Sequence, residues 1–421
     1  MGFRITTNMM MNTYRYNLMN STNTLSDSVD KVQTKRNFNS YAEDPAAASQ
    51  AFRLRRQWCQ TSSQLDNTDA TYSKFHTAWT NLGGIIKDLS DANGRVSAIR
   101  GNSDTSGESR KALAQVLRET ADSVVQSMNQ KVGEQFIFAG NDGLNVPFTW
   151  NEDHTKLYYR GVNVNAGGVQ KPTTPEPTGW GAIDTTKGTY LPENMPSSSA
   201  DPDKQAWIDY YKDQADVKKL EVMNKEELPL DMGMGLKEIN GVLVNGSAFD
   251  SALRGISFLN YGVDEKTGDP NSLPLVMREL ADVFETWGEN GQRYLPEAYR
   301  DKSYKEIQAI LEDKDSPEAK EIIEYHDAMQ AKAYRLMDKL NAAQAHTTEK
   351  YVELDAKSSF LQSNSSRLST EVTNLNEQVL GVEQINLADA ITQLSWDQMC
   401  YNAALKIGTQ LLSQSLIDYM N

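Results

Sequence analysis

Two long stretches without proline constrain this chain more than any other feature of its sequence. Of the 13 prolines among 421 residues, Pro45 stands alone near the start and the other twelve lie between Pro147 and Pro317. Residues 46–146 and 318–421 contain none. Because proline costs about 3 kcal/mol inside a helix, these two arms predict long helices that flank a middle of different character. The pattern argues against a string of independent globular enzymes.

The chain is acidic overall, and its charge is distributed unevenly along the sequence. With 42 basic and 57 acidic residues the net charge is −15, which disfavours a general binder of nucleic acid or of an anionic membrane. Residues 1–60 carry a net +4 and residues 361–421 a net −4, so the acidic excess lies in residues 61–360. We expect the complementary ends to favour pairing with each other.

No secretory signal, membrane span or disulfide scaffold is predicted. The polar first 20 residues lack the apolar region of a signal peptide, and no window approaches 18 consecutive apolar residues. We expect Cys59 and Cys400, the two cysteines, to be buried free thiols, while one bridge between them stays open. These features favour a cytosolic protein unless a signal of another kind directs export.

The first 40 residues are polar and carry only a thin apolar seam. Leu18, Leu25, Val29 and Val32 follow spacings of seven, four and three residues. Such a segment cannot bury enough surface to fold alone. It predicts either a disordered tail or a helix that forms only on meeting a partner.

The N-terminal arm begins with a strong helix signal. Asp44 before Pro45 predicts an N-cap followed by proline in the first helical turn. We expect one helix from about residue 45 to about residue 101 and, after a turn, a second helix over residues 110–134.

The middle of the chain changes character. Residues 134–150 combine β-favouring side chains with glycine and proline, and residues 157–166 alternate as a strand does. Residues 167–202 indicate a loop, residues 201–225 a short helix capped by Asp201, and residues 227–262 short strands and turns. We therefore expect a small β-rich or α+β domain here.

Helices resume after the middle. We expect helices over residues 275–287 and 304–313, and a last long arm that starts at Pro317. In that arm a heptad-like seam is formed by Leu368, Val372, Leu375, Val379 and Val382. The seam loses phase after Gly381, which predicts a joint near Gln384.

Motifs of catalysis, metal binding and cofactor binding are not found. The four histidines are widely separated, there is no zinc-type Cys/His spacing, and neither a phosphate-binding loop nor a GxSxG motif occurs. We expect no enzyme activity and assign no catalytic, cofactor-binding or metal-binding residue. The cluster of Arg53, Arg55 and Arg56 is interpreted as a polar helix face whose charges pair with acidic neighbours rather than as an anion site.

Four segments resemble the bacterial flagellin superfamily. The start, FRITTNMM (residues 3–10), is similar to the R-I-S/T…M-M opening of its hook-associated branch. KRNFNSYAEDPAAASQA (residues 35–51) resembles the G-K-R…S-D-D-P-x-A-A-S element of that branch, where flagellins more often have Asp-Asp-Ala-Ala-Gly. EQFIFAGNDGLNVPF (residues 134–148) resembles R/Q-Y-I-F-x-G…P-F. Residues 385–420 are similar to the terminal helix of the whole superfamily.

The resemblance covers about residues 1–165 and 273–421 and implies a fold. That fold is mainly α, with long antiparallel helices from both chain ends in a coiled-coil-like rod and an inserted β-rich domain. The implied domains are residues 1–40 with 386–421, which order on assembly, then 41–146 with 273–385, and an outer domain over residues 147–272.

The resemblance also implies a role and the residues that serve it. It implies a structural subunit at the junction between hook and filament, exported by the flagellar type III apparatus without a cleaved signal. The implied partners are identical subunits in a ring, flagellin, the first hook-associated protein and an export chaperone.

The resemblance further implies three groups of residues. The expected turn and helix start is Asp44, Pro45, Ala46 and Ala47. The expected passage into the outer domain is Phe136, Ile137, Phe138, Gly140, Pro147 and Phe148. The expected assembly interface comprises Ile5, Met9, Leu18, Leu25, Val29, Val32, Leu387, Ile391, Leu394, Tyr401, Leu405, Leu412 and Leu416.

Three other functions stay open at this point. One is a filament flagellin, and another is a cytosolic coiled-coil scaffold. The third is a carbohydrate-binding or enzymatic middle domain, in which Trp150, Tyr158, Tyr159, Trp180 and Tyr190 would line a sugar site; core packing is the favoured reading of these aromatic residues.

Overall fold

The computed structural model describes residues 7–420 except 102–105, 184, 186–187, 236, 240–241, 245–246 and 289–292. The chain forms two compact units, one from residues 1–66 with 365–421 and one from residues 67–364. Two long helices, α2 (Pro45–Gly101) and α8 (Pro317–Glu383), contribute to both units.

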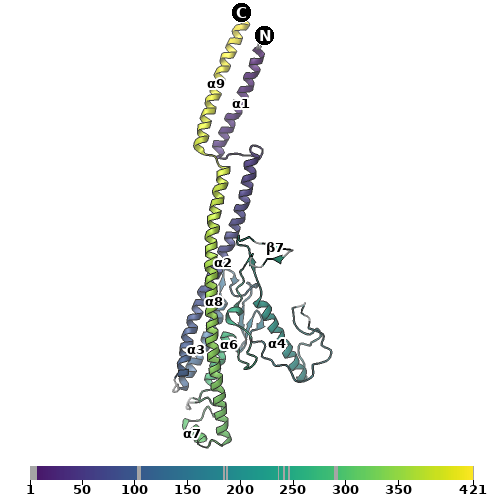
Figure 1. Ribbon diagram of the computed structural model, residues 1–421, viewed down its shortest axis with the longest axis vertical. Helices are drawn as coiled ribbons and strands as arrows, with labels where there is room; N and C mark the ends of the chain where they lie inside the picture. Colours follow the sequence, from purple (N-terminus) through teal and green to yellow (C-terminus); the bar gives the residue numbers. More distant parts are fainter. Residues whose placement is uncertain are drawn as a thin grey trace. The chain divides into compact units, whose positions relative to one another are not determined.

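The first unit contains the paired ends of the chain. Helix α1 (Thr7–Thr34) lies beside α9 (Leu387–Met420) and runs in the opposite direction, so that both termini lie at the same end of the pair (Figure 1). Below this pair, the beginning of α2 packs on the end of α8 through the predicted heptad seam, in which Leu368 and Val379 are buried. The segment 1–40 is therefore helical from Thr7 to Thr34, and the partner of this helix is the other end of the same chain.

The helix boundaries follow from local capping. The Asp44 carboxylate accepts hydrogen bonds from the backbone N–H groups of Ala46 and Ala47, at 3.1 and 2.9 Å, so Asp44 is the predicted N-cap. The predicted joint near Gln384 is the three-residue break between α8 and α9, after which the Asn386 side chain accepts from the N–H of Ala388 at 3.1 Å.

The second unit has a helical core. Helix α3 (Gly107–Met128) packs against α6 (Leu273–Glu285), and both contribute apolar side chains to one continuous core with α2 and α8. The aromatic stack of Trp79 on Tyr351 and the ion pair of Arg100 with Asp338 join α2 to α8. The order of these pairs is reversed along the two helices, so α2 and α8 are antiparallel within this unit.

Short strands and three smaller helices surround that core. The antiparallel pairs are β1 (Lys131–Val132) with β2 (Gln135–Phe136), β6 (Pro229–Leu230) with β9 (Phe249–Asp250), and β7 (Glu238–Ile239) with β8 (Val242–Leu243). A three-stranded sheet has the order β3 (Phe148–Trp150), β4 (Leu157–Tyr159), β5 (Val162–Asn163). The helices are α4 (Pro202–Asn224), α5 (Gly255–Leu259) and α7 (Tyr304–Glu312), with a 3₁₀ turn at Glu297–Tyr299.

The predicted fold class, mainly α with an inserted β-containing region, is confirmed. Helix α4 begins after its predicted cap Asp201, whose side chain accepts from the N–H of Asp203. The three-part division of the chain stays a prediction. Among the described residues no helix is long and apolar enough to cross a membrane.

Two predicted elements are wrong in detail. The second helix ends at Met128 rather than near residue 134, because Asn129 uses its side chain to pair with the backbone of Phe148, at 2.8 and 2.9 Å. Residues 157–166 form a hairpin rather than one strand, since Arg160 and Gly161 adopt positive φ values of 50° and 79°, as the tight turn of a hairpin requires.

Candidate functional site

The helices α1 and α9 meet along a narrow seam. On each helix the half-buried and buried residues recur at alternating spacings of three and four, which is the pattern of two helices packed side by side. The seam consists of Met11, Tyr14, Leu18, Ser21, Leu25, Ser28 and Val32 on α1 and of Ala390, Leu394, Asp397, Tyr401, Ala404 and Gly408 on α9. The predicted residue Val29 is also half-buried beside it.

Two contacts fix the register of the pair. The hydroxyl of Ser28 donates a 2.5 Å hydrogen bond to Asp397, whose other oxygen accepts from Gln393 at 3.1 Å. Near the other end, Gly408 lies so close to Tyr14 that an added Cβ would overlap the tyrosine ring. No ion pair joins α1 to α9 in the described part of the chain, so the expected pairing of complementary ends does not take the form of salt bridges between these helices.

The structure separates the predicted interface residues into three groups. Leu18, Leu25, Val29, Val32, Leu394 and Tyr401 face the intrachain seam, and Met9, Leu387, Ile391 and Leu405 are exposed. Ile5 and the side chains of Leu412 and Leu416 lie outside the described residues. The exposed residues of the predicted interface are accessible to a second molecule.

Sequence reasoning missed a further exposed apolar face. Trp396, Met399, Cys400, Ala403 and Ile407 on α9 are all exposed and follow helical spacings of three, one, three and four residues. We call this face the outer stripe; Trp396 is 59 % exposed and Ile407 53 %. The helical spacing of these residues is visible in the sequence, but spacing alone does not indicate which face of α9 is left exposed.

Backbone hydrogen bonds join the segment that follows α1 to the segment between α8 and α9. The N–H of Asn37 donates to the carbonyl of Glu383 at 2.7 Å, and the N–H of Ile385 donates to the carbonyl of Lys35 at 3.3 Å. Lys35 has a positive φ of 57°, so the chain reverses sharply after α1. Backbone hydrogen bonds therefore hold the segment after α1 against the segment between α8 and α9.

A pocket of about 590 Å³ opens beside this joint. Its floor includes the buried residues Ala48 and Ala51, and the exposed aromatic residues Tyr41 and Phe52 also line it. We call it the joint pocket; its polar lining is Arg36, Asn39, Ser40, Arg55, Arg56, Cys59 and Glu383.

One arginine of the predicted basic cluster is neutralised at the joint pocket. Arg55 forms an ion pair with Glu383, and this hydrogen bond raises the pKa of the arginine above its usual value. This agrees with the interpretation that the cluster pairs with acidic neighbours. Arg53 and Arg56 have no such partner within the part of the chain described.

The two thiols differ from expectation. Cys59 and Cys400 are free, as expected, but both are exposed rather than buried. Cys59 lines the joint pocket and Cys400 lies on the outer stripe, two surfaces that the described residues leave exposed.

The predicted passage into the outer domain is a buried backbone junction. Phe136, Ile137, Phe138 and Phe148 are buried, and the carbonyl of Phe138 accepts hydrogen bonds from Gly255 N–H and the Tyr159 hydroxyl. Gly140 has a φ of 66°, and Pro147 precedes β3, where its carbonyl accepts from Arg160 N–H at 2.8 Å.

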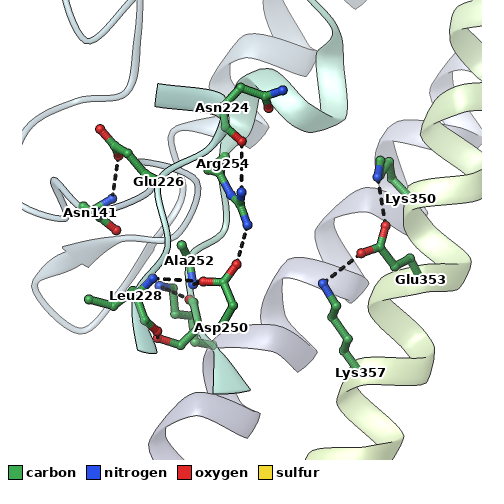
Figure 2. Close-up of polar contacts among 12 residues, drawn as sticks. Asn141, Asn224, Glu226, Leu228, Asp250, Ala252, Arg254, Lys350, Glu353 and Lys357 are labelled. Carbon is green, nitrogen blue, oxygen red and sulfur yellow. Dashed lines mark hydrogen bonds and ion pairs between the residues drawn. The ribbon is translucent and has the colours of Figure 1, made fainter. Parts of the chain in front are cut away.

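Polar side chains surround that junction (Figure 2). The Glu226 carboxylate accepts from the N–H of Asn141 at 3.4 Å. It also accepts from Arg160 at 2.7 Å. Arg254 donates to the carbonyl of Asn224 at 2.9 Å and pairs with Asp250. These contacts join the end of α4 and strand β9 to the start of the middle region.

A charged triad on α8 lies on the facing side of the same view (Figure 2). Lys357 and Lys350 both pair with Glu353, at 2.8 and 2.9 Å. Their hydrogen bonds, led by that of Lys357, lower the pKa of Glu353 to about 2. The triad lines a cavity of only about 50 Å³, which is too small for a drug-sized ligand.

The aromatic residues considered for a sugar site do not form one platform. Tyr159 is buried against Phe148, Trp150 stacks on His154, and Trp180 contacts Tyr211. Core packing explains Tyr159, whereas Trp150 and Trp180 belong to two separate aromatic contacts. No group of three or more metal-ligating side chains is found in the described residues.

The comparisons with known proteins agree with the resemblance of the sequence. Residues 5–142 match the family model of the bacterial flagellin N-terminal helical region. Over this region the match agrees with the predicted resemblance to the flagellin superfamily. A search of curated proteins finds no match.

One solved structure is similar to this chain over much of its length. It is a Vibrio parahaemolyticus protein assigned as a flagellar hook-associated protein, with 13 % identity and a TM-score of 0.44. The match covers 81 % of this chain and 99 % of the other.

Proposed function

We propose that the chain is a non-enzymatic structural subunit of the bacterial flagellum, and specifically a hook-associated junction protein of type three. It would form a ring of identical subunits between the first hook-associated protein and flagellin. The proposal rests on the flagellin N-terminal region and on the Asp44-Pro45-Ala46-Ala47 turn, which resembles the hook-associated branch more than filament flagellin.

The observation that carries an assembly role is the apolar surface of α9. A helix pair in water needs one apolar seam, and the remaining faces are ordinarily polar. Here α9 exposes the outer stripe and also Leu387, Ile391 and Leu405. Exposed apolar surface of this kind marks an interaction site, and identical subunits are the partners that the family supplies.

Export fits the same proposal. Helix α1 is polar and buries little apolar surface without α9, so it is not expected to stay folded alone. The two ends would then pass unfolded through a narrow channel and pair afterwards. We propose an extracellular location in the flagellum, export through the type III apparatus and a dedicated chaperone before export.

The experiment compares three single variants of the full chain in an assembly assay. Met399→Asp and Ile407→Asp place a charge on the outer stripe, and Asn402→Asp adds the same charge at an exposed polar position of α9. We expect the first two to prevent ring or filament formation, measured by sedimentation and electron microscopy, and Asn402→Asp to assemble. Normal assembly of all three would contradict the proposal.

A gene deletion distinguishes the junction role from that of a filament flagellin. Loss of a junction protein is expected to leave hooks and to release flagellin monomers, whereas loss of a flagellin removes the filament mass. Immunogold label at the distal end of the hook, rather than along the filament, is the matching observation.

A further inference from the structure

The joint pocket carries positive charge that the first unit does not neutralise. Arg55 is paired with Glu383. Within the described residues, no ion pair or side-chain hydrogen bond is found for the guanidinium groups of Arg36 and Arg56. Two exposed cations therefore face an opening with an apolar floor.

The shape of the pocket suits a side chain with both apolar and anionic parts. Ala48 and Ala51 form a buried apolar floor, and Phe52, which is 59 % exposed, also lines the pocket. A volume of about 590 Å³ admits one or two side chains. Guanidinium groups bind carboxylates through paired hydrogen bonds.

The charge of the chain indicates where that carboxylate comes from. Residues 1–60 have a net charge of +4 in a chain whose total is −15, so the remainder of every copy is strongly acidic. The acidic remainder of a second copy is opposite in charge to the pocket, and complementary potentials attract and orient such partners.

We propose that the joint pocket receives a carboxylate-bearing side chain of a second copy of the chain. This inference rests on the proposed function, because it assumes that the chain assembles with itself. It assigns the contact to a surface distinct from the outer stripe and makes it electrostatic rather than apolar.

Cys59 provides a direct reporter, since it lines the pocket and is an exposed free thiol. The chain without substitutions serves as the background chain, and mass spectrometry of the peptide that contains Cys59 follows its maleimide labelling separately from that of Cys400. The rate of labelling of Cys59 measures access to the pocket. We compare the full chain with an Arg36→Gln/Arg56→Gln double variant. The matched control is Arg53→Gln, which removes an exposed charge of the same helix that does not line the pocket.

We expect assembly to slow labelling of Cys59 several-fold in the background chain and in the Arg53→Gln control. In the double variant Cys59 should stay accessible, and assembly should weaken by up to about five-fold for each lost pair. Raising the salt from about 0.05 M to about 0.5 M should expose Cys59 in the background chain, because salt screens exposed charges.

The outcomes separate the two proposals. If the chain assembles while Cys59 is still labelled freely, the pocket assignment is wrong but the proposed function stands. The same holds if assembly of the double variant still slows the labelling of Cys59. Absence of any assembly by the background chain, seen in sedimentation, contradicts the proposed function and this inference with it.

Discussion

Ser28 on α1 donates a hydrogen bond to Asp397 on α9, and 369 residues separate the two along the chain. Both residues are buried in a seam that is otherwise lined by apolar and small side chains. A polar contact of this kind favours one register of two helices over others, because a shifted register would leave a buried carboxylate without its donor.

The first prediction concerns this contact. We expect Ser28→Ala to weaken the α1–α9 pair by about 1 kcal/mol, since the buried Asp397 loses one of its two side-chain donors. Hydrogen exchange of the amides in residues 10–34 and 388–408 should accelerate, while exchange in α3 and α6 stays the same. Equal acceleration in α3 and α6 would contradict a local role of this hydrogen bond.

The second prediction separates the seam from the exposed surface. Leu405→Asp changes an exposed residue, so we expect the α1–α9 pair to persist and assembly to fail. Val29→Asp changes a half-buried residue beside the seam and should disrupt both the pair and assembly, because it buries an unpaired charge. Proteolysis of the monomer reports the pair and sedimentation reports assembly. Wild-type motility of both variants would count heavily against the terminal helices as an interface.

The third prediction uses two glycines with opposite surroundings. An alanine at Gly408 would overlap Tyr14, whereas an alanine at Gly381 on α8 would meet no atom within 4 Å. We expect Gly408→Ala to destabilise the pair by about 1–3 kcal/mol through overpacking. Gly381→Ala should stabilise its helix by about 0.5–1 kcal/mol. Proteolysis of α1 should therefore accelerate in Gly408→Ala, and proteolysis near the end of α8 should slow in Gly381→Ala. Unchanged proteolysis of α1 in Gly408→Ala would refute the close approach.

The fourth prediction concerns pH. Burial is the main cause that lowers the pKa of His326, whose Nδ1 accepts from the N–H of Tyr294 at 3.0 Å. The unfolded histidine has a pKa of about 6.5, so below that pH the unfolded chain binds a proton that the folded chain binds less readily. The free energy of unfolding should therefore fall as the pH decreases from about 6.5 towards the lower folded pKa.

The His326→Gln variant tests this pH effect. Its free energy of unfolding, measured by denaturant titration between about pH 5 and pH 7, should depend less on pH than that of the unchanged chain. Identical slopes for the two proteins would show that His326 does not contribute.

Features with local causes could be predicted well. The start of α2 at Pro45, the cap of α4 at Asp201 and the break at Gln384 each depend on a few neighbouring residues, and all three are present. The end of α3 could not be predicted, because Asn129 pairs with Phe148, nineteen residues later. Exposure of Cys59 and Cys400 likewise depends on which helix faces find partners.

The sequence by itself determined the long helices, their caps and the heptad spacing of their seams, because these depend on backbone sterics and on periodicity within one segment. Only the tertiary structure decided which apolar residues of α1 and α9 are buried between the two helices and which stay exposed. Leu394 and Leu405 look alike in sequence, yet Leu394 lies in the seam and Leu405 is exposed. The physical reason is that a helix has several faces, and the face that packs is chosen by contacts between residues far apart in the chain.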